Sequence, residues 1–369
     1  MKYIDEFRDA EACQRTIDAI RQVTSRCWTI MEVCGGQTHG LLRWGIDQQL
    51  DGVVRLLHGP GCPVCVTSSS MIDAAIELSR RPDVTVTSFG DMLRVPGSQE
   101  SLLQARAGGA DVQLVYSPLD AVRLARDNPD RQVIFFSVGF ETTAPASALA
   151  VKQAAELGLE NFSLLVAHVR VLPAMEMIAS EEPSLVDGFL AAGHVCTITG
   201  FQDYAYLATD YRVPVVVTGF EPLDLLRGIH ECVSLLERDE PSVVNRYERC
   251  VSEHGNLQAK NHVEDVFRVA DRDWRGFGII PNGGLALRTE WARYDAELKY
   301  SIQDSLAIVS GDCPASEIIT GRLNPVDCPF FGKHCTPEQP MGAPMVSSEG
   351  ACAAYYRYLP ANQNSQPSL

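Results

Sequence analysis

The sequence predicts an α/β protein with parallel sheets, divided into two or three domains. Short apolar runs of strand length alternate with amphipathic runs of helix length, which is the pattern of parallel sheets covered by helices on both faces. The chain has 369 residues, more than one ordinary hydrophobic core takes up. Its 46% apolar and 21% charged residues are typical of a soluble globular protein.

Apolar periodicity defines the elements of the N-terminal part. Helices are expected at 5–27, 71–81 and 101–108, and strands at 28–33, 53–57 and 84–88. From residue 112 the pattern restarts, with strands at 112–116, 132–138, 162–167, 195–198 and 215–218, and helices at 118–127, 144–156 and 173–181. Thr67 and Ser68 are suitable caps for the helix at 71–81.

After residue 228 the strand rhythm fades. We expect helices at 229–237 and 241–253, followed by polar, irregular chain up to Arg275. A short strand at 276–285 then runs into Asn282-Gly283-Gly284, a combination more typical of a hairpin turn than of a phosphate cradle. The chain has no Walker pattern and no complete Gly-x-Gly-x-x-Gly, so the sequence offers no support for a nucleotide-driven mechanism.

The overall charge limits the class of partner. The formal charge is 31 − 47 = −16, which argues against a nucleic-acid or anionic-membrane surface. No apolar run approaches the ~20 residues that span a bilayer, and the first residues lack the apolar core of a signal peptide. We therefore expect a cytoplasmic protein. In that reducing compartment the 12 cysteines indicate metal or redox chemistry rather than structural disulfides.

Two Gly-rich motifs hold the clearest chemistry. The first is Cys34-Gly35-Gly36-Gln37-Thr38-His39, and the second is His58-Gly59-Pro60-Gly61-Cys62-Pro63-Val64-Cys65. Glycine lets the backbone approach a ligand closely. Thiolates beside imidazole suit iron, zinc or copper(I), whereas a Cys-x-x-Cys pair can also cycle between dithiol and disulfide. Cys62 and Cys65 are expected just before a helix N-terminus, which favours the thiolate.

Three acids follow predicted strands. Asp91, Glu141 and Glu221 each lie just past a strand end, and a weak internal echo relates Ser137–Glu141 to Val217–Glu221. Ligands of parallel sheets bind beyond the carboxyl ends of the strands, so these acids are candidate pocket residues. A carboxylate that caps a helix or lies in its first turn explains each of them equally well.

The C-terminal part holds four further cysteines in a Pro- and Gly-rich segment. Cys313, Cys328, Cys335 and Cys352 are separated by 14, 6 and 16 residues. Four thiolates can bind a four-iron cluster or close a tetrahedral zinc site. The cluster is favoured, because zinc ribbons use closely paired cysteines that this run lacks. Five isolated cysteines on apolar or helical stretches are interpreted as core residues: Cys13, Cys27, Cys196, Cys232 and Cys250.

Several motifs together resemble the HypD family of hydrogenase-maturation proteins. They are the two motifs above, Gly-Phe-Glu-Thr-Thr at 139–143 and Met-Val-Ser-Ser-Glu-Gly-Ala-Cys at 345–352. The resemblance covers essentially the whole chain. It implies two related Rossmann-like domains with parallel sheets, at 28–111 and 112–228. It also implies a third α/β-containing domain, made of 1–27 and 229–369, that carries a [4Fe–4S] cluster.

The resemblance also implies a role for the chain. Family members serve with a small HypC-type chaperone as a scaffold on which the Fe(CN)₂CO unit of [NiFe]-hydrogenases is built. HypE delivers cyanide made from carbamoyl groups that HypF supplies, and the hydrogenase large subunit is served indirectly. A metal-centre assembly scaffold with redox activity is therefore expected, rather than a classified enzyme.

The resemblance assigns roles to residues of the matching motifs. Cys34 would bind the iron, with His39 in the same loop, and Glu141 would line the same cleft. Cys62 and Cys65 would be the redox-active pair. Cys313, Cys328, Cys335 and Cys352 would hold the [4Fe–4S] cluster. Members commonly have Cys-Gly-Glu where this chain has Ala315-Ser316-Glu317, so the first cluster position shifts to Cys313; Pro344 is another position that is often Cys.

Two other functions are compatible with parts of the sequence. One is a thiol–disulfide oxidoreductase, in which a cluster feeds electrons to Cys62 and Cys65 and a protein disulfide is the substrate. That activity does not need Cys34 and His39 in a Gly-rich loop nearby. The other is a structural zinc protein, which leaves the N-terminal motifs unexplained. We expect the scaffold, with the cysteine pair serving its assembly chemistry.

Overall fold

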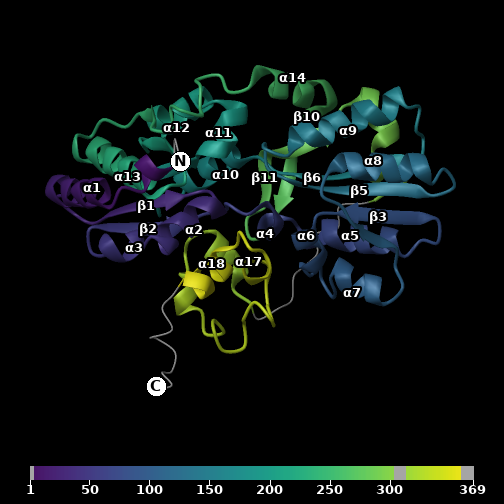
Figure 1. The fold of residues 1–369 in the computed structure, drawn as a ribbon, viewed down its shortest axis with the longest axis horizontal. Coiled ribbons are helices and arrows are strands. Elements are labelled where there is room, and N and C mark those ends of the chain that lie inside the picture. The colour runs from purple at the N-terminus through teal and green to yellow at the C-terminus, as the bar shows by residue number, and fades with distance from the viewer. Residues whose placement is uncertain (1–3, 303–312, 359–369) are drawn as a thin grey trace. The chain divides into compact units, whose positions relative to one another are not determined.

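The computed structural model describes residues 4–302 and 313–358. It is an α/β protein with two parallel sheets, of five and four strands, and a separate antiparallel pair (Figure 1). The chain divides into two compact units. The first contains the described residues of Met1–Cys62, Ile178–Glu253 and Glu317–Leu369, and the second contains those of Pro63–Met177 and His254–Ser316.

The five-stranded sheet belongs to the first unit. Its order is β2-β1-β7-β8-β9, and all neighbouring strands are parallel. The strands are β1 (Trp28–Glu32), β2 (Val54–His58), β7 (Gly188–Ala192), β8 (Val215–Thr218) and β9 (Val243–Asn245). Glu32 lies opposite His58 and Ala192 lies opposite Thr218, so polar side chains gather at one edge, the carboxyl ends of the strands.

Helices cover this sheet because each has one apolar face. α1 (Ala10–Val23) begins at Asp9, whose side chain accepts the Ala12 N–H, and it packs against α13 (Pro222–Glu237), as Figure 1 shows. Ile20 and Ile229 meet Ile30 of the sheet in the core. The other short helices are η1 (Asp5–Phe7), α2 (Gly35–Arg43), α3 (Ile46–Gln49), α11 (Gly193–Thr199), η2 (Gln202–Tyr204) and α12 (Ala205–Asp210).

The C-terminal segment of the first unit contains short helices joined by loops. Its last helix packs against α2. Within residues 313–358, the helices are α16 (Ala315–Ile319), η4 (Pro325–Asp327), α17 (Ala343–Val346) and α18 (Ala351–Tyr358).

The second unit has the four-stranded sheet, in the order β4-β3-β5-β6. Its strands are β3 (Val84–Ser88), β4 (Val112–Leu114), β5 (Gln132–Gly139) and β6 (Phe162–His168). Its helices are α4 (Pro63–Val66), α5 (Ser69–Ser79), α6 (Gly90–Arg94), α7 (Leu102–Ala107), α8 (Pro118–Asp127), α9 (Ala144–Glu156), α10 (Val171–Ala179, which ends beyond the unit's boundary), α14 (Leu257–Val266), η3 (Thr289–Tyr294) and α15 (Ala296–Lys299). The antiparallel pair is β10 (Phe267–Trp274) and β11 (Gly278–Leu287).

Most elements up to residue 181 match the predicted ones to within a few residues. α8 and α9 begin and end where the sequence pattern places them, and α5 is capped by Ser68, whose hydroxyl accepts the Met71 N–H. The helix expected at 5–27 is shorter, since α1 ends at Val23. None of the described helices is long and apolar enough to cross a membrane.

One predicted strand is wrong. Residues 195–198 lie in α11, and the strand next to β1 is instead β7, Gly188–Ala192. β7 contains glycine and four other residues, none of which is β-branched, whereas Val195, Thr197 and Ile198 are β-branched. Full burial of β7 between β1 and β8 overrides these local preferences.

The region from 229 to 287 also differs from the prediction. The helix expected at 241–253 is wrong, because Val243–Asn245 forms β9 and pairs with β8. The chain up to Arg275, expected to be irregular, contains α14 and β10. The hairpin turn lies between Trp274 and Gly278. Asn282 and Gly283 are within β11, close to a register shift between Ala270 and Arg272, so the expected turn at this position is also wrong.

Sheet membership does not follow the expected ranges 28–111 and 112–228. β1 and β2 pair with later strands of the first unit, whereas β3 pairs with β4 and β5 in the second. The chain therefore leaves the first sheet after β2 and returns to it at β7. The two sheets belong to two compact units, and the division into three domains stays a prediction.

Candidate functional site

Cys34 lies at the carboxyl end of the first sheet. It follows β1 and serves as the N-cap of α2, and its backbone carbonyl accepts the N–H groups of Gln37 and Thr38. The side chain is 4% exposed. Its Sγ lies 3.5 Å from Nδ1 of His194, the second residue of α11. The thiol therefore meets an imidazole brought from a distant part of the chain.

Glycines allow the two sequence motifs to come together here. The Gly35 N–H donates to the carbonyl oxygen of Gly61 at 3.2 Å. A Cβ on Gly61 would collide with the backbone of Cys34, and a Cβ on Gly35 would collide with the Glu349 carbonyl. Only glycine fits at either position. Gly36, by contrast, is exposed, so the chain beside the thiol is open to solvent.

A buried carboxylate holds the Cys34 loop. Glu32 is the last residue of β1 and is fully buried. One of its oxygens, Oε2, accepts the Cys34 N–H at 2.7 Å. The other, Oε1, accepts the Thr38 hydroxyl and lies 2.7 Å from Nδ1 of His58. Three donors thus satisfy this carboxylate, which keeps the loop in one conformation.

The surroundings set the protonation of the thiol and the imidazole. Burial raises the pKa of Cys34 well above its ordinary value, and the negative charge of Glu32 adds to this effect. Burial also lowers the pKa of His194, so its ring is neutral at pH 7. A neutral ring beside a protonated thiol can accept its proton when a metal replaces it.

Sequence reasoning missed His194. Residues 195–198 were expected to be a strand, which removed the neighbouring histidine from any strand end. The sequence does contain one indication of this position. The apolar run Gly188–Ala192, which forms β7, ends directly before Gly193-His194. Gln37 of the first motif is buried and donates to Ala191 O at 3.1 Å and to Thr218 Oγ1 at 2.7 Å, so it fastens α2 to β7 and β8.

His39 faces the C-terminal segment. Its Nε2 lies 2.5 Å from the Ser348 carbonyl oxygen and its Nδ1 lies 3.4 Å from the Tyr358 hydroxyl. His39 thus lies in α2, the helix that Cys34 caps, and it contacts residues in and just before α18. A role for His39 at the metal stays a prediction.

Cys62 and Cys65 are both disulfide-bonded, and the other ten cysteines are not in disulfides. Cys62 is 5% exposed and directly precedes α4, whereas Cys65 is 2% exposed and lies within this four-residue helix. Both cysteines precede α5, the helix predicted at 71–81, but Cys65 lies in α4, a short helix that was not predicted. The redox role of the pair stays a prediction.

Three C-terminal cysteines share one buried cluster. Cys328, Cys335 and Cys352 pack with Ile318 and Met345 in the first unit. The Met341 N–H donates to the Cys335 sulfur at 3.4 Å, a contact that is also common around sulfur ligands of iron. This donor set fits the cluster that the sequence predicts, although among the described residues no group of three or more Cys, His, Asp or Glu already has metal-binding geometry.

Cys313, the fourth predicted ligand, is half-buried and belongs to the second unit. Its assignment as a cluster ligand therefore stays a prediction.

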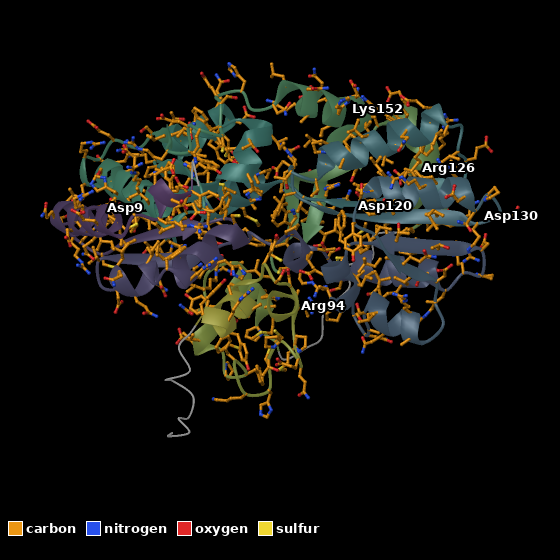
Figure 2. The ribbon with its side chains drawn as sticks, in the orientation of Figure 1. Asp9, Arg94, Asp120, Arg126, Asp130 and Lys152 are labelled. Atoms are coloured by element: carbon orange, nitrogen blue, oxygen red, sulfur yellow. The ribbon has the colours of Figure 1, made fainter. Side chains whose placement is uncertain are left out.

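The three acids at strand ends have different environments. Asp91 lies in the first turn of α6 and pairs with Arg94, which is labelled in Figure 2. Glu221 is the N-cap of α13 and pairs with Arg8. Asp91 therefore has the helix-start role, whereas Glu221 both caps α13 and lines a pocket together with Phe220 and Arg249.

Glu141, in the second unit, is different: the residue as a whole is half-buried, but one oxygen of its carboxyl group is buried. Its Oε1 accepts the Val171 N–H at 2.9 Å, and its buried Oε2 has no hydrogen-bond partner among the described residues. Burial raises the pKa of this carboxyl group. Cys34 belongs to the first unit, so the cleft expected to contain both residues stays a prediction.

Comparison with known proteins gives one consistent result. Residues 11–359 match the family HypD, described as "Hydrogenase formation hypA family". The chain is 46% identical over 369 residues to the hydrogenase maturation factor HypD2 of Bradyrhizobium diazoefficiens, with 97% of each chain covered. It is 43% identical to the hydrogenase maturation factor HypD of Rhodobacter capsulatus and 42% identical to that of Escherichia coli, with 97% of this chain and 98% of each relative covered.

Proposed function

The chain belongs to the HypD family of hydrogenase maturation factors, and we propose that it is the scaffold on which the Fe(CN)₂CO unit of a [NiFe]-hydrogenase is assembled. The observation that carries the proposal is the Cys34 site. A buried thiol, a neutral imidazole at 3.5 Å and an open Gly-rich loop stand together at the carboxyl end of a parallel sheet.

Iron is the cargo of this site and Cys34 is its ligand from this chain. Thiolate is a soft ligand that suits low-valent iron. Because the Cys34 thiol keeps its proton in the metal-free protein, iron binding must release that proton, and His194 Nδ1 is placed to accept it. Glu32 holds the loop through the Cys34 N–H, so the sulfur need not be reoriented when iron arrives.

The open side of the loop is where a partner can approach. Gly36 is exposed, so a small HypC-type chaperone with its own ligating cysteine can approach the iron from this side of the loop, beside the Phe220 ring. HypE, with HypF upstream, is the expected source of cyanide. The large subunit of the hydrogenase is the expected final acceptor.

The remaining cysteines supply electrons in this proposal. Cys328, Cys335 and Cys352, together with Cys313, would hold a [4Fe–4S] cluster, which stores one electron at a time. Cys62 and Cys65 would form the dithiol that serves chemistry at the iron. Their disulfide form is the oxidised state of such a pair.

A second candidate function is a thiol–disulfide oxidoreductase that acts on a protein disulfide. The disulfide form of Cys62 and Cys65 favours it. It gives no role to the buried carboxylate and imidazole around Cys34, however, and for this reason the scaffold is preferred.

Infrared spectroscopy tests the scaffold directly. The protein is produced anaerobically together with its maturation partners, and the cyanide and carbonyl stretching region is recorded. We expect bands of an Fe(CN)₂CO unit in the unmodified protein and at least a tenfold loss of them in Cys34→Ala, because the iron then lacks its protein ligand.

Cys232→Ala is the matched control, since it removes a buried sulfur from the core of the same unit. Its bands should equal those of the unmodified protein. Bands of full intensity in Cys34→Ala would show that iron is held elsewhere and would overturn the proposal.

A further inference from the structure

The C-terminal helix contributes a buried hydroxyl to the network below Cys34. α18 packs against α2, and Tyr355 of α18 is 6% exposed. Its hydroxyl lies 2.9 Å from Nε2 of His58, and the two rings meet edge to face with their centroids 5.2 Å apart. Tyr355 therefore touches the same histidine that binds Glu32.

The hydrogen bonds of this network have one consistent direction. Burial raises the pKa of Tyr355 to about 12, so its hydroxyl is protonated and can donate to His58 Nε2. His58 then carries its own proton on Nδ1 and donates it to Glu32 Oε1. The Asn324 amide donates to the Tyr355 oxygen at 3.3 Å. Every donor in the path has an acceptor.

We propose that Tyr355 is a positioning residue for Cys34, which it orients through the path Tyr355–His58–Glu32 to the Cys34 N–H. This proposal rests on the proposed function in one respect, namely that Cys34 is the iron ligand. The hydroxyl fixes the ring of His58, the ring presents Nδ1–H to Glu32, and Glu32 sets the loop from which the thiol projects.

Burial is the reason why one hydroxyl can have this effect. His58 is 5% exposed and Glu32 is fully buried, so water cannot replace a lost partner at low cost. Without the Tyr355 hydroxyl, the buried Nε2 atom of His58 loses this hydrogen-bond donor. The ring can then rotate or change tautomer, and Glu32 loses a fixed donor.

α18 also connects this path to the cysteine cluster. Cys352 and Tyr355 are three residues apart on the helix, which places them on neighbouring faces one turn apart. The helix that carries a predicted cluster ligand is thus the helix that orients Cys34. The hydrogen-bond path therefore links the Cys34 loop to the helix that carries Cys352, in addition to stabilising the fold.

The test compares Tyr355→Phe with Tyr356→Phe. Both changes remove one hydroxyl from the same helix, but Tyr356 is 39% exposed. The rate at which Cys34 is alkylated is measured by mass spectrometry of its peptide. We expect about a fivefold faster rate in Tyr355→Phe, which is the factor that corresponds to loss of one ordinary hydrogen bond. Tyr356→Phe should leave the rate unchanged.

A second pair of variants separates positioning from general loosening. His58→Asn breaks the link between Tyr355 and Glu32 by another route. Its side-chain amide keeps an N–H for Glu32 but is too short to reach the Tyr355 hydroxyl. The double variant Tyr355→Phe/His58→Asn should react no faster than either single variant, because all three lack one common link. Additive rates would show that the two residues act independently and would overturn the proposal, as would an unchanged rate in Tyr355→Phe.

Infrared spectra of iron-loaded protein add a signature that loosening alone would not produce. We expect the cyanide and carbonyl bands of Tyr355→Phe to shift or broaden, while those of Tyr356→Phe keep their positions. If the unmodified protein showed no such bands, the proposed function would fail, whereas the alkylation rates would still decide the role of Tyr355. If Tyr355→Phe failed to fold, His58→Asn tests the same link by the same measurements.

Discussion

Three histidines lie at the carboxyl ends of buried strands, and each has a different environment. His58 ends β2 and lies beside Glu32, whereas His168 ends β6 and lies 3.0 Å and 3.1 Å from two serine hydroxyls, those of Ser137 and Ser147. His194 follows β7 and stands beside Cys34. Burial lowers the pKa of His168 and of His194, so both rings are neutral at pH 7.

His168 should make the second unit sensitive to acid. Burial lowers its pKa to about 4, and the Arg272 guanidinium adds to the shift. In the unfolded chain the pKa is about 6.5, so between these values the unfolded state binds a proton that the folded state does not. The free energy of unfolding is therefore highest above pH 6.5. It falls by an amount on the order of 3 kcal/mol as the pH drops from 6.5 to about 4.

Urea unfolding at pH 7.0 and pH 5.0 measures this effect. His168→Gln cannot take up the proton, so its midpoint should change less between the two pH values than that of the unmodified protein. His254→Gln, which changes an exposed histidine of the same unit, is the control and should keep the full dependence. Equal pH dependence in His168→Gln would show that other groups cause the acid sensitivity.

The chemistry expected of single residues could largely be predicted from the sequence, but the residues that lie next to them in the fold could not. The motif around Cys34 indicates a soft metal, because thiol and imidazole occur close together in the chain. His194 and Tyr355 are brought to this site by pairing of β7 and by docking of α18. Such contacts depend on tertiary packing, for which a single sequence contains no local signal.

At the scale of elements, the prediction was correct where the local pattern and the burial agree. α8 and α9 have amphipathic sequences with proline in the first turn, and β5 and β6 are continuous apolar runs. β7 and β9 failed for opposite reasons. β7 is a strand despite residues of low strand propensity, and β9 has only three residues, too few for a periodic signal.

The cluster of three C-terminal cysteines leads to a prediction about metal content. Anaerobically prepared protein should contain about four irons with acid-labile sulfide and should show visible absorption that bleaches on reduction. Cys328→Ala, Cys335→Ala and Cys352→Ala should each lose this absorption, because each sulfur lies in the buried cluster. Cys250→Ala, which changes an exposed cysteine of the same unit, should retain it.

Cys313→Ala decides the fourth ligand. Loss of absorption would assign the first cluster position to Cys313, whereas retained absorption would indicate a different ligand. Stoichiometric zinc without sulfide in the unmodified protein would contradict the cluster altogether, because it would identify a structural zinc site instead.

At the scale of the whole molecule, the chain passes from one sheet to the other and back. β1 and β2 precede the second unit in the sequence, and β7 to β9 complete the first sheet more than one hundred residues later. The alternation of strands and helices is the same in both units, so the pattern predicts the fold class without showing which strands pair. Consecutive strands usually share a sheet, but β2 and β3 belong to different sheets, and β3 pairs with β4 and β5.

The change from the first unit to the second falls between Cys62 and Pro63, inside the Cys-x-x-Cys motif.

We predict that Cys62 and Cys65 interconvert reversibly between disulfide and dithiol. The protein is equilibrated at graded redox potentials, its thiols are trapped, and the labelled peptides are identified by mass spectrometry. A single two-electron transition should include both cysteines, because two residues between them suit an intraloop disulfide and both are disulfide-bonded in the structure. The exposed thiols of Cys27 and Cys250 serve as internal controls and should remain labelled throughout. Full reduction of the pair at every potential, together with unimpaired hydrogenase maturation in Cys62→Ser, would rule the redox role out.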